Sequence, residues 1–254
     1  SGHAVSVRRR AQKAKRACRL KTGAAAQTGC ADAYAPIPLT GAPRLRIIQT
    51  VRTCRQSGKK PDCRFDTDRT GSEGFCVNIT VYLGANEGND PALREAVQEL
   101  GTWIGTSGNA LVYGGSRSGL MGAIADSVLR SGGEVTGVEP RCFIESEFQH
   151  DGLTELIVTE DMAERKRKMI ELGDAFIAFP GGTGTLEEIA EVMSKVSLKH
   201  LDAPCILYNL NGYYDDLKAL LNHMIEKGLS SNERQEGIFF VENLDDIKRI
   251  LRRA

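Results

Sequence analysis

The chain has 254 residues, of which 41% are hydrophobic and 26% are charged, a composition typical of soluble globular proteins. No stretch has the roughly 18 uncharged apolar residues that a membrane span needs, so a membrane partner is not expected. The length allows one doubly wound domain, or a domain of about 180 residues with an appendage.

The net charge of zero hides two oppositely charged parts. Residues 1–74 carry 16 Lys and Arg against 5 Asp and Glu, whereas the remainder carries 17 against 28. We expect residues 1–74 to be a basic, poorly ordered extension, because they lack any helical or alternating pattern, and we interpret residues 1–3 as the remnant of an expression tag. A nucleic-acid-binding arm, the less favoured reading, and an organelle transit segment are the alternatives.

From residue 75 the sequence alternates between apolar strands and amphipathic helices. Strands are expected at residues 77–83, 110–113, 134–138, 153–158, 174–179, 204–208 and 238–241. Helices are expected at residues 91–104, 120–129, 161–172, 184–198, 213–226 and 244–251. This rhythm is typical of right-handed βαβ units, so residues 75–254 are predicted to form a single α/β domain with a Rossmann-like, doubly wound parallel sheet.

Three glycine-rich junctions follow predicted strands, and they should meet at one edge of the sheet, where such folds bind ligands. The first junction is Gly84-Ala85-Asn86. The second contains Gly114, Gly115, Ser116, Gly119 and Met121. The third begins at Pro180 and continues with Gly181, Gly182, Thr183, Gly184, Thr185 and Leu186.

Glycines let backbone N–H groups approach an anion, and the N-terminus of the helix that follows favours a phosphate. Tight turns alone could explain the second junction, but the third packs three glycines and two threonines behind Pro180. It lacks the Lys of a Walker A sequence, and the first junction lacks the dinucleotide pattern Gly-x-Gly-x-x-Gly. A bound monophosphate is therefore expected.

Two carboxylates, Glu187 and Glu188, come directly after the third junction, in the first turn of a helix. They point about 100° apart, so they cannot both face one atom. They could simply complement the helix dipole. However, a carboxylate beside an anion site repels the ligand, which favours a catalytic role instead, such as stabilising the positive charge that develops on a ribose during N-glycosidic cleavage.

Four consecutive cations, residues 165–168, lie on the helix at 161–172. Most should face solvent, although an Arg among them could clamp a phosphate. No metal site or organic cofactor is expected, because the seven cysteines include no C-x-x-C pair and the histidines lack metal-ligand spacing. Reduced thiols in a cytoplasmic protein are the simplest interpretation of the cysteines.

Three segments together resemble the LOG family, the cytokinin riboside 5′-monophosphate phosphoribohydrolases formerly labelled lysine decarboxylases: Tyr113 to Gly122, Glu164-Arg165-Lys166, and Pro180 to Glu188. The resemblance covers residues 77 to about 252. It implies a homodimer, or an assembly of dimers, that hydrolyses AMP or an N6-substituted AMP to the free base and ribose 5-phosphate. The chain lacks a pyridoxal-phosphate lysine pattern, so decarboxylation is not expected.

The resemblance implies that Arg165 and Glu188 form the catalytic pair. The resemblance also implies that the nucleotide is bound by Lys166, Glu147, Ser194 and the stretch from Gly182 to Glu188, which includes Glu187. Further candidates for substrate binding are the junction residues Asn86, Gly114, Gly115, Ser116, Gly119, Met121 and Gly181.

The chain also departs from the family pattern. Leu83-Gly84-Ala85-Asn86 stands where Cys-Gly-Ser-Ser is common, and Glu139 replaces the usual apolar residue before Pro140. The helix after the glycine signature lacks the Trp-x-Gln-Leu of many members. These departures bear on substrate identity more than on reaction class. The alternative is a non-catalytic nucleotide-binding protein on the same scaffold, similar to molybdenum-cofactor carriers.

Overall fold

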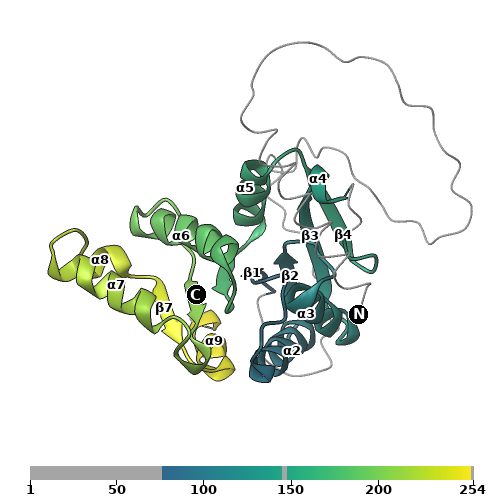
Figure 1. Cartoon of the computed structure of the whole chain (residues 1–254), viewed down its shortest axis with the longest axis horizontal. Coiled ribbons are helices and arrows are strands. Elements are labelled where there is room, and N and C mark those ends of the chain that lie inside the picture. Colours follow the sequence, from purple (N-terminus) through teal and green to yellow (C-terminus); the bar gives the residue numbers. More distant parts are fainter. Residues whose placement is uncertain (1–75, 145–147, 253–254) are drawn as a thin grey trace, which may run out of the picture.

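The computed structural model describes residues 76–144 and 148–252 (Figure 1). Seven strands form one parallel sheet in the order β4-β3-β2-β1-β5-β6-β7. The strands are β1 (Asn78–Tyr82), β2 (Ala110–Tyr113), β3 (Glu134–Pro140), β4 (Glu155–Thr159), β5 (Ala175–Ala178), β6 (Cys205–Tyr208) and β7 (Ile238–Val241). The predicted Rossmann-like α/β fold is confirmed. The basic extension at residues 1–74 lies outside the described residues.

The helices alternate with the strands, as the sequence predicts. The longer ones are α2 (Pro91–Thr106), α3 (Gly119–Arg130), α5 (Met162–Leu172), α6 (Thr183–Ser197), α7 (Asp215–Glu226) and α9 (Leu244–Leu251). The short ones, which hydrophobic periodicity cannot reveal, are α4 (Arg141–Ile144), α8 (Asn232–Gln235) and the 3₁₀ turn η1 (Leu210–Gly212). None of the described helices has both the length and the apolar character of a membrane span.

One helix starts later than expected. The helix predicted at residues 213–226 begins at Asp215, because Asn211 and Gly212 adopt positive φ angles of 53° and 74° that interrupt the chain before it. Tyr213 and Tyr214 therefore lie in the turn ahead of α7, where their side chains reach back towards the strand ends.

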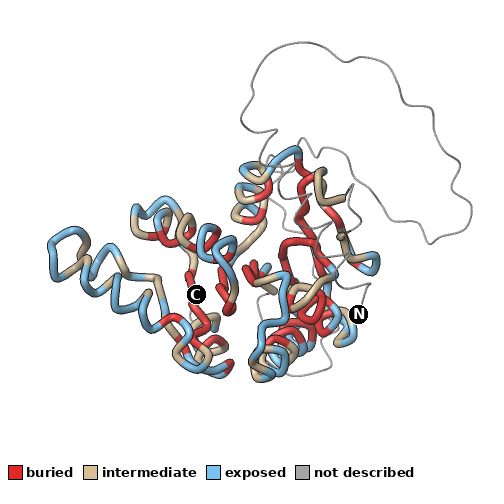
Figure 2. Tube along the Cα trace, in the orientation of Figure 1, coloured by how far each residue is buried: buried red, intermediate tan, exposed pale blue. Residues whose placement is uncertain are grey.

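The sheet has a separate apolar core on each face (Figures 1 and 2). Along β1, Ile79 and Val81 pack with α2, α3 and α9, whereas Tyr82 packs with α5, α6 and α7. The central strands are buried on both faces, which is why they read as nearly continuous apolar runs.

The point where the strand order reverses lies between β1 and β5. From β1 the chain runs outward through β2, β3 and β4, and it then returns to form β5 on the other side of β1. The loops that leave these strands diverge here, which is where doubly wound sheets bind ligands. The two loops touch, because a β-carbon added to Gly84 would lie 3.7 Å from the Cα atom of Gly181.

Gly101→Ala tests the close packing of α2 on α3. Helix propensity alone favours alanine by about 1 kcal/mol. However, the new β-carbon would lie 2.8 Å from Cβ of Ser127 and 2.9 Å from the carbonyl oxygen of Ile124. We expect the free energy of unfolding, measured in denaturant, to fall by about 1–3 kcal/mol.

The matched control is Thr102→Ala on the exposed face of the same helix. It should change the free energy of unfolding by less than about 0.5 kcal/mol. A Gly101→Ala variant as stable as the wild type would contradict this account of the helix pair.

Candidate active site

The loops after β1 and β2 pack backbone against backbone. Gly119 has φ +57°, and a β-carbon there would collide with the carbonyl group of Ala85. Gly115 has φ +86°, and a β-carbon there would lie 2.8 Å from Oε2 of Glu139. Gly114 lies directly against the guanidinium of Arg165. Glycine is therefore required at these three positions by the closeness of their neighbours, and at two of them also by φ.

The loop after β5 leads into the open N-terminus of α6. Gly182 is the N-cap and offers no side-chain cap, whereas α2 and α5 are capped by Asp90 and Asp161. A β-carbon on Gly182 or Gly184 would meet no atom within 4 Å. The first N–H groups of a helix have no intrahelical partner, so the amides that begin α6 are disposed to bind an anion.

Two neighbouring tyrosines hold the chain on either side of Pro180. The hydroxyl of Tyr213 donates to the carbonyl oxygen of Gly181, and that of Tyr214 donates to the carbonyl oxygen of Phe179 at 2.9 Å. The two rings meet edge to face with their centroids 4.9 Å apart. These hydroxyls fix the peptide groups that set the path of the loop into α6.

Arg165 and Glu188 form a buried ion pair, and their residues are only 5% and 7% exposed. Arg165 comes from α5 and Glu188 from α6, so the pair joins two neighbouring helices on one face of the sheet. The Nη1 group of Arg165 bonds to Oε1 of Glu188, and its Nε donates to the carbonyl oxygen of Val138 at 2.9 Å. The guanidinium therefore spans from the end of β3 to α6.

Tyr82 lies at the end of β1 near this pair. Burial raises the pKa of its phenol, and the negative charge of Glu188 raises it further. The phenol consequently stays protonated and contributes a neutral hydroxyl beneath the ion pair.

Lys166 and Glu187 form a second pair nearer the surface. Nζ of Lys166 lies 2.8 Å from Oε1 of Glu187 and 3.4 Å from Oε2 of Glu191. The hydrogen bond to Glu187 raises the pKa of Lys166. The side chain of Glu187 is 66% exposed, in contrast to buried Glu188, which agrees with the 100° separation expected from the helix geometry.

The remaining predicted residues fall into several places. Ser116 is buried, and its Oγ accepts from the amide of Ser118 at 3.2 Å, whereas Asn86 is exposed in the loop after β1. Met121 lies beside Gly114, and Thr185 is buried beneath Gly181. Leu186 and Ser194 are exposed on α6, and the amide of Leu186 donates to the carbonyl oxygen of Gly182 at 3.1 Å. Glu147 lies outside the described residues.

Glu139 is a site neighbour whose position the sequence reveals only as a departure from the family pattern. It is 2% exposed and lies behind Gly115, and no hydrogen-bond partner meets its Oε2 atom in the described structure. Burial raises the pKa of its carboxyl to about 7, while the charge of Arg165 opposes the rise. In the sequence, the position of Glu139 is indicated only by a glutamate near the end of a predicted apolar strand, where the family has an apolar residue.

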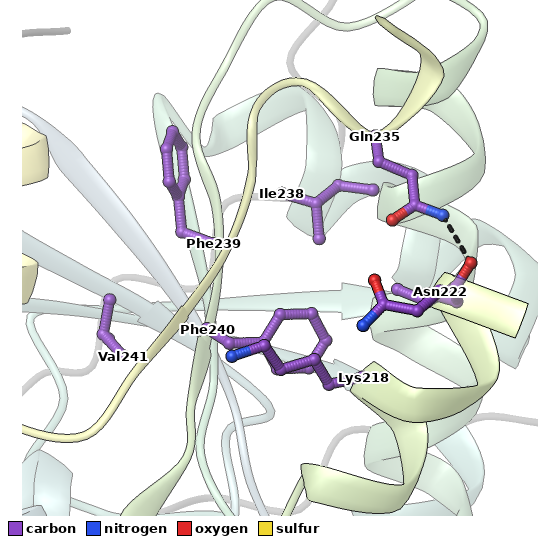
Figure 3. Close-up of a pocket in the computed structure, with 8 residues that line it drawn as sticks. Lys218, Asn222, Gln235, Ile238, Phe239, Phe240 and Val241 are labelled. Carbon is purple, nitrogen blue, oxygen red and sulfur yellow. Dashed lines mark hydrogen bonds between the residues drawn. The ribbon is translucent and has the colours of Figure 1, made fainter. Parts of the chain in front are cut away.

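A pocket of 310 Å³ lies away from these loops, beside the edge strand β7 and helix α7 (Figure 3). Nζ of Lys218 sits 6.0 Å from the ring centroid of Phe240, and Gln235 donates to the carbonyl oxygen of Leu221 at 2.8 Å. The pocket lining has no carboxylate, thiol or imidazole. The described residues include no cluster of His, Cys, Asp or Glu that could hold a metal.

The site combines a Rossmann-like sheet, an open helix N-terminus that suits an anion, and a buried carboxylate–guanidinium pair. The family described as "Possible lysine decarboxylase" matches residues 121–251. A cytokinin riboside 5′-monophosphate phosphoribohydrolase from Rhodococcoides fascians is 41% identical over 169 residues, which cover 66% of this chain and 85% of that protein. One from Arabidopsis thaliana is 39% identical over 153 residues, with coverage of 60% and 72%. The chain belongs to this family, which is described as "Possible lysine decarboxylase" and is represented here by the two phosphoribohydrolases.

The fold is also shared with a molybdenum cofactor carrier protein from Chlamydomonas reinhardtii. The two chains superpose with a TM-score of 0.53 at 19% sequence identity, over 71% of this chain and all of the carrier. Identity this low indicates a common fold and no more.

Tyr213→Phe tests the role of the tyrosine pair in anion binding. Loss of one hydrogen bond to the loop should weaken the binding of inorganic phosphate by up to about tenfold, since such a bond contributes about 0.5–1.5 kcal/mol. The exposed ring should leave the free energy of unfolding almost unchanged. Isothermal titration calorimetry measures the affinity, and denaturant unfolding measures the stability.

Tyr214→Phe is the matched variant. Tyr214 is buried, so its loss leaves the carbonyl oxygen of Phe179 without its partner, and stability should fall by about 1–3 kcal/mol. If Tyr213→Phe bound phosphate as tightly as the wild type, the loop-positioning role of Tyr213 would be wrong.

Proposed function

We propose that the protein hydrolyses the N-glycosidic bond of a purine nucleoside 5′-monophosphate, either AMP or an N6-substituted AMP of the cytokinin type. The products are the free base and ribose 5-phosphate. The observation that carries the proposal is the buried Arg165–Glu188 pair beneath the open N-terminus of α6. The names of the family members support the same substrate class.

In this proposal the phosphate binds the amides that begin α6. Residues 181–185 form its binding loop, with the hydroxyl of Thr183 at the exposed rim. The loops after β1 and β2, which contain Asn86 and Gly114, border the sugar and the base together with Met121 in the first turn of α3. Lys166 adds positive charge at the entrance. A monophosphate needs no Walker A lysine, which is consistent with the composition of the loop.

The chemistry is assigned to Glu188 and Arg165. Glu188 follows Thr185 by one helical turn, a rise of about 4.5 Å, so a ribose whose phosphate binds the helix start can place C1′ near this carboxylate. Cleavage of the bond to the base develops positive charge at C1′, which the Glu188 carboxylate stabilises while it orients the attacking water. The water adds its oxygen to C1′ and loses a proton, and the departing base takes up one proton at its nitrogen. Arg165 holds the carboxylate in place, because its Nε is bonded to the carbonyl oxygen of Val138 and its guanidinium packs against Gly114.

A non-catalytic carrier of a phosphorylated cofactor is the second candidate, since the fold is shared with molybdenum cofactor carriers. Such a protein needs the helix N-terminus but has no use for a carboxylate there, which repels an anionic ligand. The position of Glu188 therefore favours hydrolysis.

We further propose that residues 75–254 act as one domain in a homodimer, or an assembly of dimers, in the cytoplasm. Two apolar side chains support self-association because they are exposed to solvent. Leu186 on α6 is 45% exposed, and Leu198 at the end of α6 is 56% exposed. Sedimentation equilibrium should give a mass of at least twice the 27.7 kDa of one chain. A single species at the monomer mass would contradict the assembly.

Glu188→Gln tests the proposed mechanism. The substitution keeps the shape of the side chain but removes the negative charge, so kcat for release of base from AMP should fall by about 100-fold or more. AMP should still bind, because the phosphate loop is untouched. Chromatographic detection of the free base measures turnover, and calorimetry measures binding.

Glu171→Gln is the matched control, near the end of α5. Its carboxylate is exposed and pairs with Lys168 at the surface, so kcat should change by less than about threefold. Equal turnover by wild type and Glu188→Gln would refute the mechanism. AMP binding without release of base by the wild type would favour the carrier.

A further inference from the structure

Glu139 is a second buried carboxyl group near Arg165, close enough for the charge of Arg165 to act on it without forming a direct ion pair. The carbonyl oxygen of Val138, the residue before it, accepts the Nε–H of Arg165 at 2.9 Å. Arg165 lies against Gly114, and the carboxyl of Glu139 lies against Gly115. Consecutive Cα atoms are about 3.8 Å apart, so the guanidinium and this carboxyl flank the same dipeptide.

This cluster has two carboxyl groups, Glu139 and Glu188, near the one guanidinium of Arg165. One buried guanidinium can neutralise one carboxylate, and Glu188 already forms that ion pair. The Oε2 atom of Glu139 is buried and has no hydrogen-bond partner among the described residues. An oxygen of this kind needs either a proton or a share of the nearest cation. The raised pKa of Glu139, about 7, follows from the same burial.

We propose that Glu139 is a positioning residue that competes with Glu188 for the guanidinium of Arg165, and so sets how tightly Arg165 holds the proposed catalytic carboxylate. When Glu139 is protonated and neutral, the full electrostatic attraction of Arg165 acts on the carboxylate of Glu188. With Glu139 ionised, part of the attraction of Arg165 is withdrawn, and more of the charge on Glu188 is left for the developing cation at C1′. The inference rests on the proposed function for its catalytic consequence only.

The other charged groups around Glu139 come from each neighbouring element. Burial raises the pKa of the Tyr113 phenol on β2, and the nearby charge of Glu139 raises it further. His150 pairs with Asp126 of α3 at 3.0 Å and donates its amide to the carbonyl oxygen of Gly115. Beyond the end of β3, Arg141 pairs with Glu160 at 2.8 Å. Arg165 is thus the cation whose charge acts on Glu139 from within the site.

The test follows the protonated carboxyl of Glu139 by difference infrared spectroscopy on the full chain, with the band assigned by its loss in Glu139→Gln. In the wild type the band should disappear as the pH rises through about 7. In Glu188→Gln, Glu139 is the remaining carboxylate near Arg165 among the described residues, so the midpoint should move down by about one pH unit or more. If Glu188→Gln does not fold, Glu188→Asp should give a smaller shift in the same direction.

An identical midpoint in the wild type and the Glu188 variant would overturn the competition between the two carboxyls. This readout needs no turnover, so it judges the inference even if the protein does not hydrolyse AMP, a result that would count against the proposed function alone.

The catalytic consequence is a pH step in kcat at saturating AMP. The wild-type value should rise several-fold as Glu139 loses its proton, because a unit charge acts on the developing cation even at an effective dielectric constant near 20. Glu139→Gln should lack that step and stay at the level of the acidic limb. His150→Gln should keep the step, which separates the effect from protonation of the nearby imidazole. A step that persists in Glu139→Gln would refute the positioning role.

Discussion

The buried bond between Arg165 and Glu188 is the constraint around which the functional edge of this protein is organised. Removing two charges from water is costly, and further hydrogen bonds to the charged groups offset part of that cost. Arg165 has one such bond, from its Nε to the carbonyl oxygen of Val138, and its guanidinium packs against Gly114, where no side chain could fit. The ion pair thereby fixes α5, α6 and the strand ends relative to one another.

The fold provides this arrangement between β1 and β5, where the order of the strands in the sheet reverses. The loops after β1 and β5 diverge there, and the open start of α6 projects above them. Amide groups for an anion and a carboxylate for a developing cation thus lie about one helical turn apart on the same helix. In a nucleoside monophosphate the phosphate can bind the amides while C1′ lies near the carboxylate, which is why this geometry suits its hydrolysis.

Much of this could be predicted from the sequence, because its determinants are local. The strand–helix rhythm predicts the parallel sheet, the glycines mark the loops, and helix geometry separates Glu187 from Glu188. Tertiary effects could not be predicted. Four cations follow one another on α5, and only packing selects Arg165 for burial. The hydrogen bond of Tyr213 depends on a turn created by positive φ angles, and the burial of Glu139 depends on the neighbouring loop.

The most direct measurement of the central claim is a crystal structure of the Glu188→Gln variant with AMP bound. The account predicts the phosphate against the amides of residues 183–185, with C1′ facing the side chain at position 188 and Arg165 still bonded to it. A nucleotide bound elsewhere, or one whose C1′ points away from residue 188, would contradict the account.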